Sequence, residues 1–571
     1  MEELIIIKQI SYSCVFPKGK DNLEELLKII PSKSAISWAS NMLLKKKMKI
    51  KKEEELQLFI PLLFKMNNEL QHALTKYLEL IKNEINNFNF IDEVTLLILI
   101  EHLLENHNNK SEDVFTSEED FSNLFITYLI CCDEKLEYSN KIINHNNNSN
   151  SLRTLILPEQ LRINDIYCPK DYRIEFLRFY YFMIFCEGDK KFREYLKLFL
   201  QDNHIKKWDD YLYFIFNTYS STLTNSQGST NLIKIDPDNY YGKPYLDRMC
   251  IDVENFKKTA DFTHLRSKPI YYHGDNTYSI ISTNFFIDKM FQSFLFDFAS
   301  VLIKHKQITK INSYPELKAM VGNFFTENHL FYELMKGCFS KTYKKLISGQ
   351  ELKKYIGNGE PDFYIRKGKN IFIFEFKDVM LNAKTKQSKN IEIIKSEIFQ
   401  LFVSSTIEKN TGKQKKKPQS KGITQLLNVI ESKLDLIIHN VDKIEVTDKL
   451  NVYPIIVYQD SCLDIEGINY ILSNKFEELK TSKNISETFL IKKCVMMPFK
   501  LMISLEDYFQ DGRLELGILI DNFINECNLS EKNKLLPFNK FIMRQAYKLG
   551  YKNRMSQKFK SVFDSIVEKN K

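Results

Sequence analysis

The sequence predicts an α-rich α+β protein of several domains. The chain has 571 residues, which is more than a single domain usually holds. Hydrophobic residues make up 43% of it, enough to bury large cores, so a disordered chain is excluded. Glycine (17) and proline (14) are sparse, which favours helices over a loop-rich all-β fold. Apolar residues recur at helical spacing along most of the chain, for example over 62–85 and 93–105. Short β-rich runs concentrate after residue 315, near 352–357, 361–366 and 370–377.

Polar stretches and changes of pattern divide the chain into four expected regions. Only one of them mixes helices with successive strands, and we expect it to form a compact α/β domain flanked by large helical regions. The regions are 1–150 (helical), 151–315 (helical, with a β-hairpin near 269–282), 316–482 (mixed, with a Lys-rich insertion at 380–421) and 483–571 (helical and basic).

Several classes of protein are excluded by what the chain lacks. Its longest apolar stretches fall far short of the ~20 residues that a membrane span needs. The start, Met-Glu-Glu-Leu-Ile-Ile-Ile-Lys, is acidic, and its apolar run is too short for a secretory signal. The ten cysteines contain no C-x-x-C, and neither they nor the ten histidines show zinc-ligand spacing. We therefore expect a soluble, cytoplasmic protein with reduced thiols and no membrane partner.

The positive charge is concentrated in two segments. The net charge is +8, and 70 of the 81 basic residues are lysines, an excess that an AT-rich genome alone can produce. The distribution is more informative, because residues 380–422 carry +7, residues 532–571 carry +9, and the rest of the chain carries −8. Segregation of this kind is typical of a protein that binds a polyanion. Two solvated basic faces without a partner would give the same pattern.

One pair of expected strands carries the most informative residues. The stretch 359–377 reads GEPDFYIRKGKNIFIFEFK, with a turn at 367–370 between two apolar strands. Side chains alternate between the faces of a strand, so Glu375 and Lys377 share one face while three phenylalanines take the other. A hairpin at this turn brings Asp362 close to Glu375. Two acids and a lysine are therefore expected together at the end of a buried strand.

This placement predicts a chemistry. Two neighbouring carboxylates are costly unless a cation neutralises them, and Mg²⁺ or Mn²⁺ is the natural partner for oxygen ligands. The backbone carbonyl of Phe376 supplies a further candidate ligand beside Asp362 and Glu375. The ammonium of Lys377 can hold a water and favour its deprotonated form. Such a group of residues suits hydrolysis of a phosphodiester bond. A solvent-exposed ion pair is the alternative for Glu375 and Lys377, but the strand is apolar on both faces.

The pattern resembles the PD-(D/E)xK nuclease superfamily, whose members share a restriction-endonuclease-like core. The matching pieces are Pro-Asp at 361–362 and, after a gap of twelve residues, Glu-Phe-Lys at 375–377. The resemblance implies a mixed sheet with the element order α-β-β-β-α-β. It also implies that Asp362 and Glu375 bind the metal ion and that Lys377 orients or activates the attacking water.

Two further residues are implied by the same resemblance, which covers roughly residues 320–480. Family members often supply another acid from the first core helix, and Glu333 is the better match here, with Glu327 as the weaker one. A glutamine on the helix after the motif also recurs, and Gln425 stands in that place. The branch that has a tyrosine four residues after this glutamine is not matched, because position 429 is Val.

The two basic segments are the expected contacts for nucleic acid. Phosphate neutralisation by lysines on a loop is independent of sequence and sensitive to salt. In the C-terminal segment basic residues alternate with aromatic ones, which most simply anchor a helix to the body of the protein. The candidate contacts are Lys413, Lys415, Lys416, Lys417 and Lys421 in the insertion, and Arg544, Lys548, Lys552 and Arg554 in the C-terminal segment.

Together these observations predict a metal-dependent endonuclease, with DNA favoured over RNA as its substrate. A nuclease core joined to a large helical region, in a Lys- and Asn-rich chain, resembles prokaryotic anti-phage and restriction-type systems. Residues 1–310 would then bind a trigger or a protein partner. The alternatives are a non-cleaving nucleic-acid-binding or scaffold protein, and a nuclease for a mobile-element or repair step. The intact set of Asp362, Glu375 and Lys377 favours cleavage.

Overall fold

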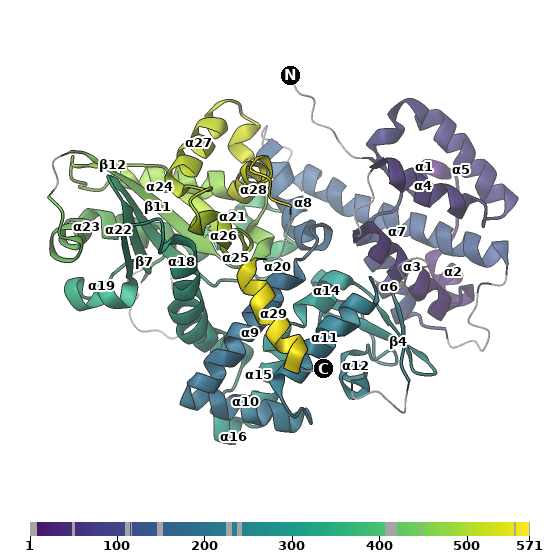
Figure 1. Ribbon diagram of the computed structural model, residues 1–571. Helices are drawn as coiled ribbons and strands as arrows, with labels where there is room; N and C mark the ends of the chain where they lie inside the picture. Colours follow the sequence, from purple (N-terminus) through teal and green to yellow (C-terminus); the bar gives the residue numbers. More distant parts are fainter. Residues whose placement is uncertain are drawn as a thin grey trace, which may run out of the picture. The chain divides into compact units, whose positions relative to one another are not determined.

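The computed structural model divides the chain into two compact units (Figure 1). Unit 1 contains Met1–His145, Asp165–Tyr172 and Asp210–Phe294, and unit 2 contains Asn146–Asn164, Arg173–Asp209 and Leu295–Lys571. The chain crosses between the units several times, so neither unit follows the four linear regions expected from the sequence. The structure describes residues 8–47, 52–108, 115, 117–145, 152–223, 231–236, 242–405, 419–445, 448–552 and 556–569.

Unit 1 is mainly helical. Its helix α6 (Glu93–Glu105) has the bounds that periodicity predicts, and it begins where the Asp92 side chain accepts a hydrogen bond from the Thr95 amide. Asp92 is buried, and its charge is compensated by Lys135 at 2.8 Å on α7 (Glu118–His145). The other helices of this unit are α1 (Tyr12–Val15), α2 (Leu23–Ile29), α3 (Ser32–Lys47), α4 (Lys52–Leu63), α5 (Asn68–Ile81), most of α11 (Trp208–Ser221), α12 (Lys243–Met249), α13 (Thr263–Ser267) and α14 (Thr283–Asp288).

The hairpin predicted near 269–282 is confirmed. Strands β4 (Ile270–Gly274) and β5 (Thr277–Ile280) pair antiparallel, and Asp275 and Asn276 turn the chain with φ of 48° and 54°. Both residue types tolerate this left-handed conformation better than most. Strand β3 (Leu232–Lys234) pairs with β5 and completes a three-stranded sheet.

Unit 2 is built on a six-stranded mixed sheet. The strand order is β12-β11-β8-β7-β6, with β13 also paired to β11. Strand β7 runs antiparallel to β6 and β8, whereas β11 is parallel to β8, β12 and β13. The central strands therefore have partners on both edges. The strands are β6 (Lys345–Ser348), β7 (Phe363–Lys367), β8 (Asn370–Lys377), β11 (Leu450–Tyr458), β12 (Phe489–Ile491) and β13 (Val495–Pro498).

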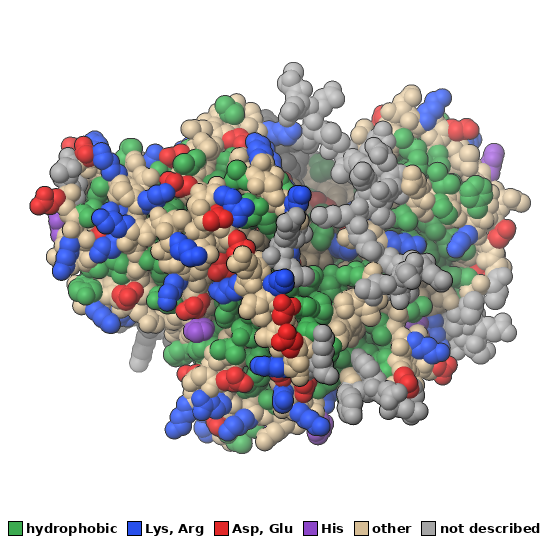
Figure 2. Space-filling view, viewed as in Figure 1, with side chains coloured by type: hydrophobic (Ala, Val, Ile, Leu, Met, Phe, Trp, Pro, Cys, Tyr) green, Lys and Arg blue, Asp and Glu red, His purple; other side chains and the backbone are tan. Residues whose placement is uncertain are grey.

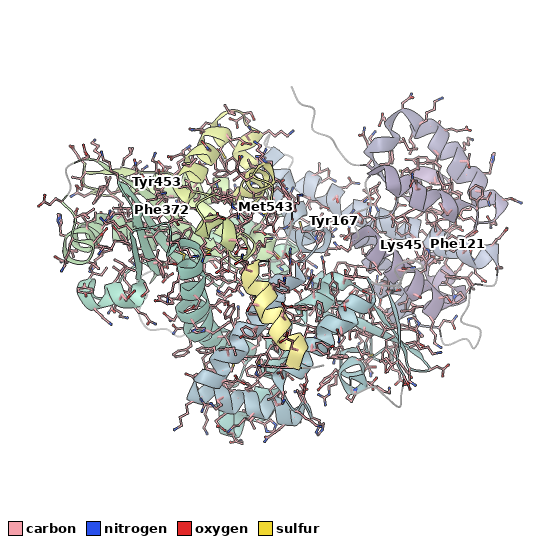
Figure 3. The ribbon with its side chains drawn as sticks, viewed as in Figure 1. Lys45, Phe121, Tyr167, Phe372, Tyr453 and Met543 are labelled. Atoms are coloured by element: carbon pink, nitrogen blue, oxygen red, sulfur yellow. The ribbon has the colours of Figure 1, made fainter. Side chains whose placement is uncertain are left out.

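Helices cover both faces of this sheet. On one face, Ile371 and Ile373 of β8 belong to a buried cluster that includes residues of α21 (Ile391–Phe402), α22 (Gly422–Ser432) and α24 (Ile468–Lys480). On the other face, Phe372 of β8 stacks on Tyr453 of β11 at 4.7 Å between ring centroids (Figure 3). Phe372 also lies beneath Gly517 of α27 (Leu516–Asn528). The apolar alternation that the sequence shows is thus a strand buried on both sides.

Two expected elements differ from the sequence interpretation. The β-rich run near 352–357 is the end of helix α19 (Gly349–Ile356), which starts with a capping box between Ser348 and Glu351. The strand that pairs with β7 here is β6, which ends at Ser348, the residue that caps α19. The boundary expected at residue 482 also falls inside the sheet, because β12 and β13 come after it. Residues 483–571 are therefore not purely helical.

The rest of unit 2 is mainly helical, and its aromatic residues form a core rather than an exposed platform. Phe182 lies 5.8 Å from Phe298 and 5.1 Å from Phe325 between ring centroids. The α-rich α+β class is confirmed. Within the described residues, no helix combines the length and apolar character that a membrane crossing requires. These helices include α9 (Tyr172–Gly188), α10 (Lys190–Asp202), α15 (Phe294–Lys304), α17 (Tyr314–Met320), the π-helix η3 (Val321–Phe331), α18 (Tyr332–Phe339), α25 (Lys500–Ser504), α26 (Glu506–Gln510), α28 (Phe538–Lys548) and α29 (Gln557–Lys569).

Candidate active site

The structure brings Asp362 and Glu375 together as the sequence predicts. Asp362 directly precedes β7, and its amide donates to the Phe374 carbonyl of β8 at 3.0 Å. Its carboxylate oxygen Oδ2 accepts a hydrogen bond from the Phe376 amide at 2.6 Å. Since Phe363 pairs with Phe374, Asp362 lies opposite Glu375 on the same face of the sheet. The hairpin thus sets the two acids side by side.

The main chain around Asp362 is held by a glycine. The Gly349 amide donates to the Asp362 carbonyl at 2.8 Å, at the start of helix α19. A Cβ at Gly349 would lie only 2.7 Å from the Pro361 carbonyl oxygen and 3.3 Å from the Asp362 Cα. No larger residue fits without moving the strand that carries the acid. The backbone of α19 therefore fixes the position of Asp362.

Lys377 links Glu375 to Gln425. Its ammonium Nζ lies 2.5 Å from Glu375 Oε1 and donates to Gln425 Oε1 at 2.9 Å. The same Gln425 oxygen accepts a hydrogen bond from the Gly422 amide at 2.8 Å, at the start of α22. Gly422 has φ of 44°, and a Cβ there would lie 2.5 Å from the Phe402 carbonyl oxygen. The close approach of α22 to the end of α21 thus brings Gln425 to the site strand.

The helix acid in contact with this group is Glu327, not Glu333. Glu327 lies on the π-helix η3, and its carboxyl group hydrogen-bonds to that of Asp362. Glu333 lies on the next helix, α18, where its charge acts on His329 and Glu506 instead. A π-helix has more residues per turn than an α-helix, so the side chains of this segment do not follow α-helical spacing. The structure therefore favours the weaker of the two sequence matches.

Burial and mutual repulsion shift the pKa values of all three acids in the same direction. Burial and the charge of Asp362 raise the pKa of Glu327 to about 8. Burial likewise raises the pKa of Asp362, although Lys377 opposes the rise. Burial and Asp362 raise the pKa of Glu375 well above its ordinary value. Burial disfavours the ammonium of Lys377, but the charges of Glu375 and Asp362 outweigh it and raise the Lys377 pKa. Without a cation the site thus favours retaining a proton.

The carboxylate oxygens of this group suit a divalent cation, although they are not placed as a complete set of metal ligands. Within the described residues, no group of three or more His, Cys, Asp or Glu side chains is placed to hold a metal ion. However, Glu375 is only 2% exposed, and its oxygen Oε2 is buried without a hydrogen-bond partner. A buried carboxylate oxygen of this kind is costly unless something neutralises it. Asp362, Glu375 and Glu327 therefore offer oxygen ligands of the type that Mg²⁺ and Mn²⁺ prefer.

The backbone of Phe376 is directed to the same place. Its N–H points to Asp362. The N–H and C=O of one strand residue point to the same edge, so the Phe376 carbonyl is also directed to the edge at which Asp362 lies. This direction agrees with the sequence prediction of a carbonyl ligand.

The chain was compared with known protein families, curated proteins and solved structures. No match was found. The chemistry of this site must therefore be argued from its own geometry.

The sequence interpretation missed an acid beside the motif. Asp378 follows Lys377 directly, and its Oδ1 lies 2.5 Å from the ammonium of Lys318 on α17. Its other oxygen, Oδ2, is buried without a hydrogen-bond partner. A Cβ added to Gly322 of η3 would lie 3.6 Å from that oxygen. The ion pair therefore joins the end of β8 to the helical segment that carries Glu327. The sequence signal for Asp378 was its position directly after the lysine of the motif.

The predicted nucleic-acid contacts are described only in part. Lys413, Lys415, Lys416, Lys417 and Arg554 lie outside the described residues. Lys421 directly precedes α22 and is half-buried, whereas Lys548 and Lys552 are exposed. Arg544 lies 2.5 Å from Glu526.

The aromatic residues of the C-terminal segment separate into two groups. Phe541, Tyr551 and Phe559 are buried, as anchors to the body of the protein would be, and Tyr547 is 52% exposed. On the face shown in Figure 2, basic and acidic side chains are interspersed over unit 2.

Proposed function

We propose that this protein is a metal-dependent nuclease that hydrolyses phosphodiester bonds, with its active site at Asp362, Glu375 and Lys377. One observation carries the proposal. A buried strand ends in a carboxylate with an orphaned oxygen, a second carboxylate lies opposite it, and a lysine is held over the first. A buried group of this composition is costly to the fold, and costly polar groups cluster at functional sites.

The order of elements supports a restriction-endonuclease-like core. Helix α18 is followed by the antiparallel strands β6, β7 and β8, then by α22 and by β11. The last strand is parallel to β8. This is the α-β-β-β-α-β order expected from the resemblance, with helix α19 and the Lys-rich insertion as additions. Asp362 directly precedes β7 and Glu375 lies on β8, and these are the two central strands of this arrangement.

Each residue of the site has a role in this proposal. Asp362, Glu375 and the Phe376 carbonyl would hold Mg²⁺ or Mn²⁺, with Glu327 as the further acid. A bound divalent ion supplies positive charge that activates a water and stabilises the charge that develops on the phosphate. Lys377 would orient the attacking water, because its ammonium lies 2.5 Å from Glu375 Oε1. Gln425 positions Lys377 through their hydrogen bond.

Purified full-length protein incubated with plasmid DNA, linear DNA and RNA, with Mn²⁺, Mg²⁺ or EDTA, tests the proposal. We expect cleavage with either metal ion, no cleavage with EDTA, and a preference for DNA over RNA. An Asp362→Asn preparation that is folded and purified in the same way serves as the control for a contaminating nuclease. Tight nucleic-acid binding without cleavage under every condition would support the alternative of a non-cleaving binder or scaffold protein.

The biological setting is a further part of the proposal. A nuclease core in a chain whose unit 1 is largely helical agrees with an effector of prokaryotic defence against phage or foreign DNA, acting in the cytoplasm. Unit 1 would then recognise the trigger or a protein partner. Expression in bacteria challenged with phage, comparing the wild type with Asp362→Asn, tests this setting separately from the chemistry.

A further inference from the structure

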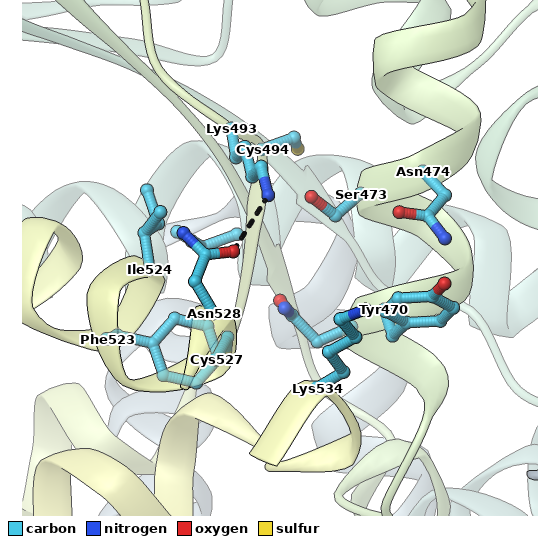
Figure 4. Close-up of a pocket in the computed structure, with 12 residues that line it drawn as sticks. Tyr470, Ser473, Asn474, Lys493, Cys494, Phe523, Ile524, Cys527, Asn528 and Lys534 are labelled. Atoms are coloured by element: carbon cyan, nitrogen blue, oxygen red, sulfur yellow. Dashed lines mark hydrogen bonds between the residues drawn. The ribbon is translucent and has the colours of Figure 1, made fainter. Parts of the chain in front are cut away.

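A cavity of about 260 Å³ lies in unit 2, apart from the three active-site residues (Figure 4). Its wall is formed by the first half of α24, the residues that lead into β13, the end of α27 and the turn η6 (Asn533–Leu535). None of Asp362, Glu375 and Lys377 lines it. The cavity therefore needs an explanation other than the proposed hydrolysis.

The polar part of this wall is positively charged. Two lysines line it, Lys493 before β13 and Lys534 on η6, together with amide side chains that include Asn474 and Asn528. Among the described residues that line the cavity, none is acidic. Ammonium, amide and hydroxyl groups without a carboxylate form a set that favours an anion.

Both ammonium groups are accessible to a ligand. Lys493 Nζ donates to the neutral amide oxygen of Asn528 at 3.4 Å, as the dashed line in Figure 4 marks, so its charge is not compensated by this bond. Lys534 pairs with Glu531 one turn earlier, but Glu531 is 74% exposed and does not line the cavity. An exposed pair of this kind contributes little and can give way to a phosphate.

The wall also has apolar parts. Tyr470 of α24 and Ile524 of α27 are half-buried, so each offers surface to the cavity, whereas Phe523 and Val495 are only 1% exposed and offer almost none. The ring of Tyr470 suits a flat ligand ring. A ligand for this cavity thus combines an anionic group with a flat, largely apolar body.

We propose that this cavity binds a nucleoside monophosphate. Lys493 and Lys534 contact the phosphate, and the base lies against the ring of Tyr470. The volume of about 260 Å³ is slightly below the usual range of ligand pockets, roughly 300–1,000 Å³, so a dinucleotide is too large. The proposal does not depend on the nuclease activity, because no residue of the active site contributes to the cavity.

Calorimetric titration of the full-length protein tests this proposal. The ligands are AMP, GMP, CMP, UMP, adenosine, inorganic phosphate and a 5′-phosphorylated tetranucleotide. The variants are Lys493→Met, Lys534→Met and the double variant. Lys492→Met is the matched control, because Lys492 is the chain neighbour of Lys493 but pairs with Asp521 and does not line the cavity. A thermal melt of each variant without ligand confirms that it is folded.

We expect at least one of the four monophosphates to bind at least tenfold more tightly than its nucleoside or inorganic phosphate. Each single variant should weaken that binding about tenfold or more, the double variant should abolish it, and Lys492→Met should leave it unchanged. The proposal is overturned if no monophosphate binds or if the double variant binds as the wild type does. It is also overturned if inorganic phosphate or the tetranucleotide binds as tightly as the best monophosphate.

Discussion

Lys377 and Gln425 are joined by a hydrogen bond of 2.9 Å between residues 48 positions apart in the chain. The bond gives the ammonium a neutral acceptor in addition to Glu375, so its position is set by two elements, β8 and α22. We predict that Gln425→Leu lowers the rate of cleavage roughly tenfold and changes the affinity for substrate little. Gln425→Glu keeps an acceptor and should retain more activity at equal protein stability. Single-turnover cleavage over a range of substrate concentrations separates these effects.

Lys377 itself should be far more important to cleavage. Loss of a positioned group of this kind costs ~10² to 10⁴ in rate, which we expect for Lys377→Met. The same change leaves Glu375 buried without its cation, so the melting temperature should fall most at high pH, where Glu375 is least able to stay protonated. Cleavage that simply follows the folded fraction in a parallel melt would remove Lys377 from the mechanism.

Removal of an acid should separate stability from activity. We predict that Asp362→Asn abolishes cleavage and raises the melting temperature of the metal-free protein, because repulsion with Glu327 and Glu375 disappears. The asparagine oxygen can still accept the hydrogen bond from the Phe376 amide, so the hairpin should be retained. Differential scanning calorimetry in EDTA measures the shift. A lower melting temperature would show that the acid stabilises the fold instead.

Glu327 and Glu333 form a matched pair for a mutational test. Glu327→Gln should reduce cleavage strongly, whereas Glu333→Gln, on the next helix, should leave it near the wild-type value. The prediction rests on the hydrogen bond between the carboxyl groups of Glu327 and Asp362. The reverse result would restore Glu333 as the helix acid and remove the geometric argument for η3.

The raised pKa of Glu327 predicts how stability depends on pH. An unfolded glutamate titrates near 4.5, whereas in the folded protein the pKa of Glu327 is about 8. Between these values the folded protein holds a proton that the unfolded chain has released, so the free energy of unfolding falls as pH rises across the window. Thermal melts of the metal-free protein from pH 5 to 9 measure the fall. We expect Glu327→Gln to flatten the dependence, and an identical slope in this variant would contradict the assignment.

A buried ion pair provides a purely structural comparison. Asp442, in the π-helical segment η4 (Ile437–Asp442), contacts Arg366 of β7 and accepts a hydrogen bond from Tyr364 at 2.8 Å. Breaking such a pair by removing one partner typically costs about 3–5 kcal/mol, which we expect for Arg366→Met in urea unfolding. Cleavage per folded molecule should be unchanged, because Arg366 lies four positions from Asp362 along β7.

Local patterns in the sequence predicted the site strand but not every residue that surrounds it. Glu375 and Lys377 could be placed because alternation along one strand fixes which side chains share a face. Gln425 could be placed only through the family resemblance, and its bond to Lys377 agrees with that prediction. Glu327 was ranked second as a match to the family's helix acid, and nothing in the sequence shows that its segment is a π-helix. The pairing of β12 and β13 with β11 depends on contacts between distant segments, which no local pattern reveals.

The two glycines that fix the main chain near the acids have a consequence for genetic experiments. Gly349 and Gly422 have no room for a Cβ, so the spacing between segments is set by backbone atoms that a compensating side chain cannot restore. In a library of random variants, both positions should tolerate as little change as Asp362 and Glu375 do. A survey of tolerance alone would then report two essential residues that never touch the substrate.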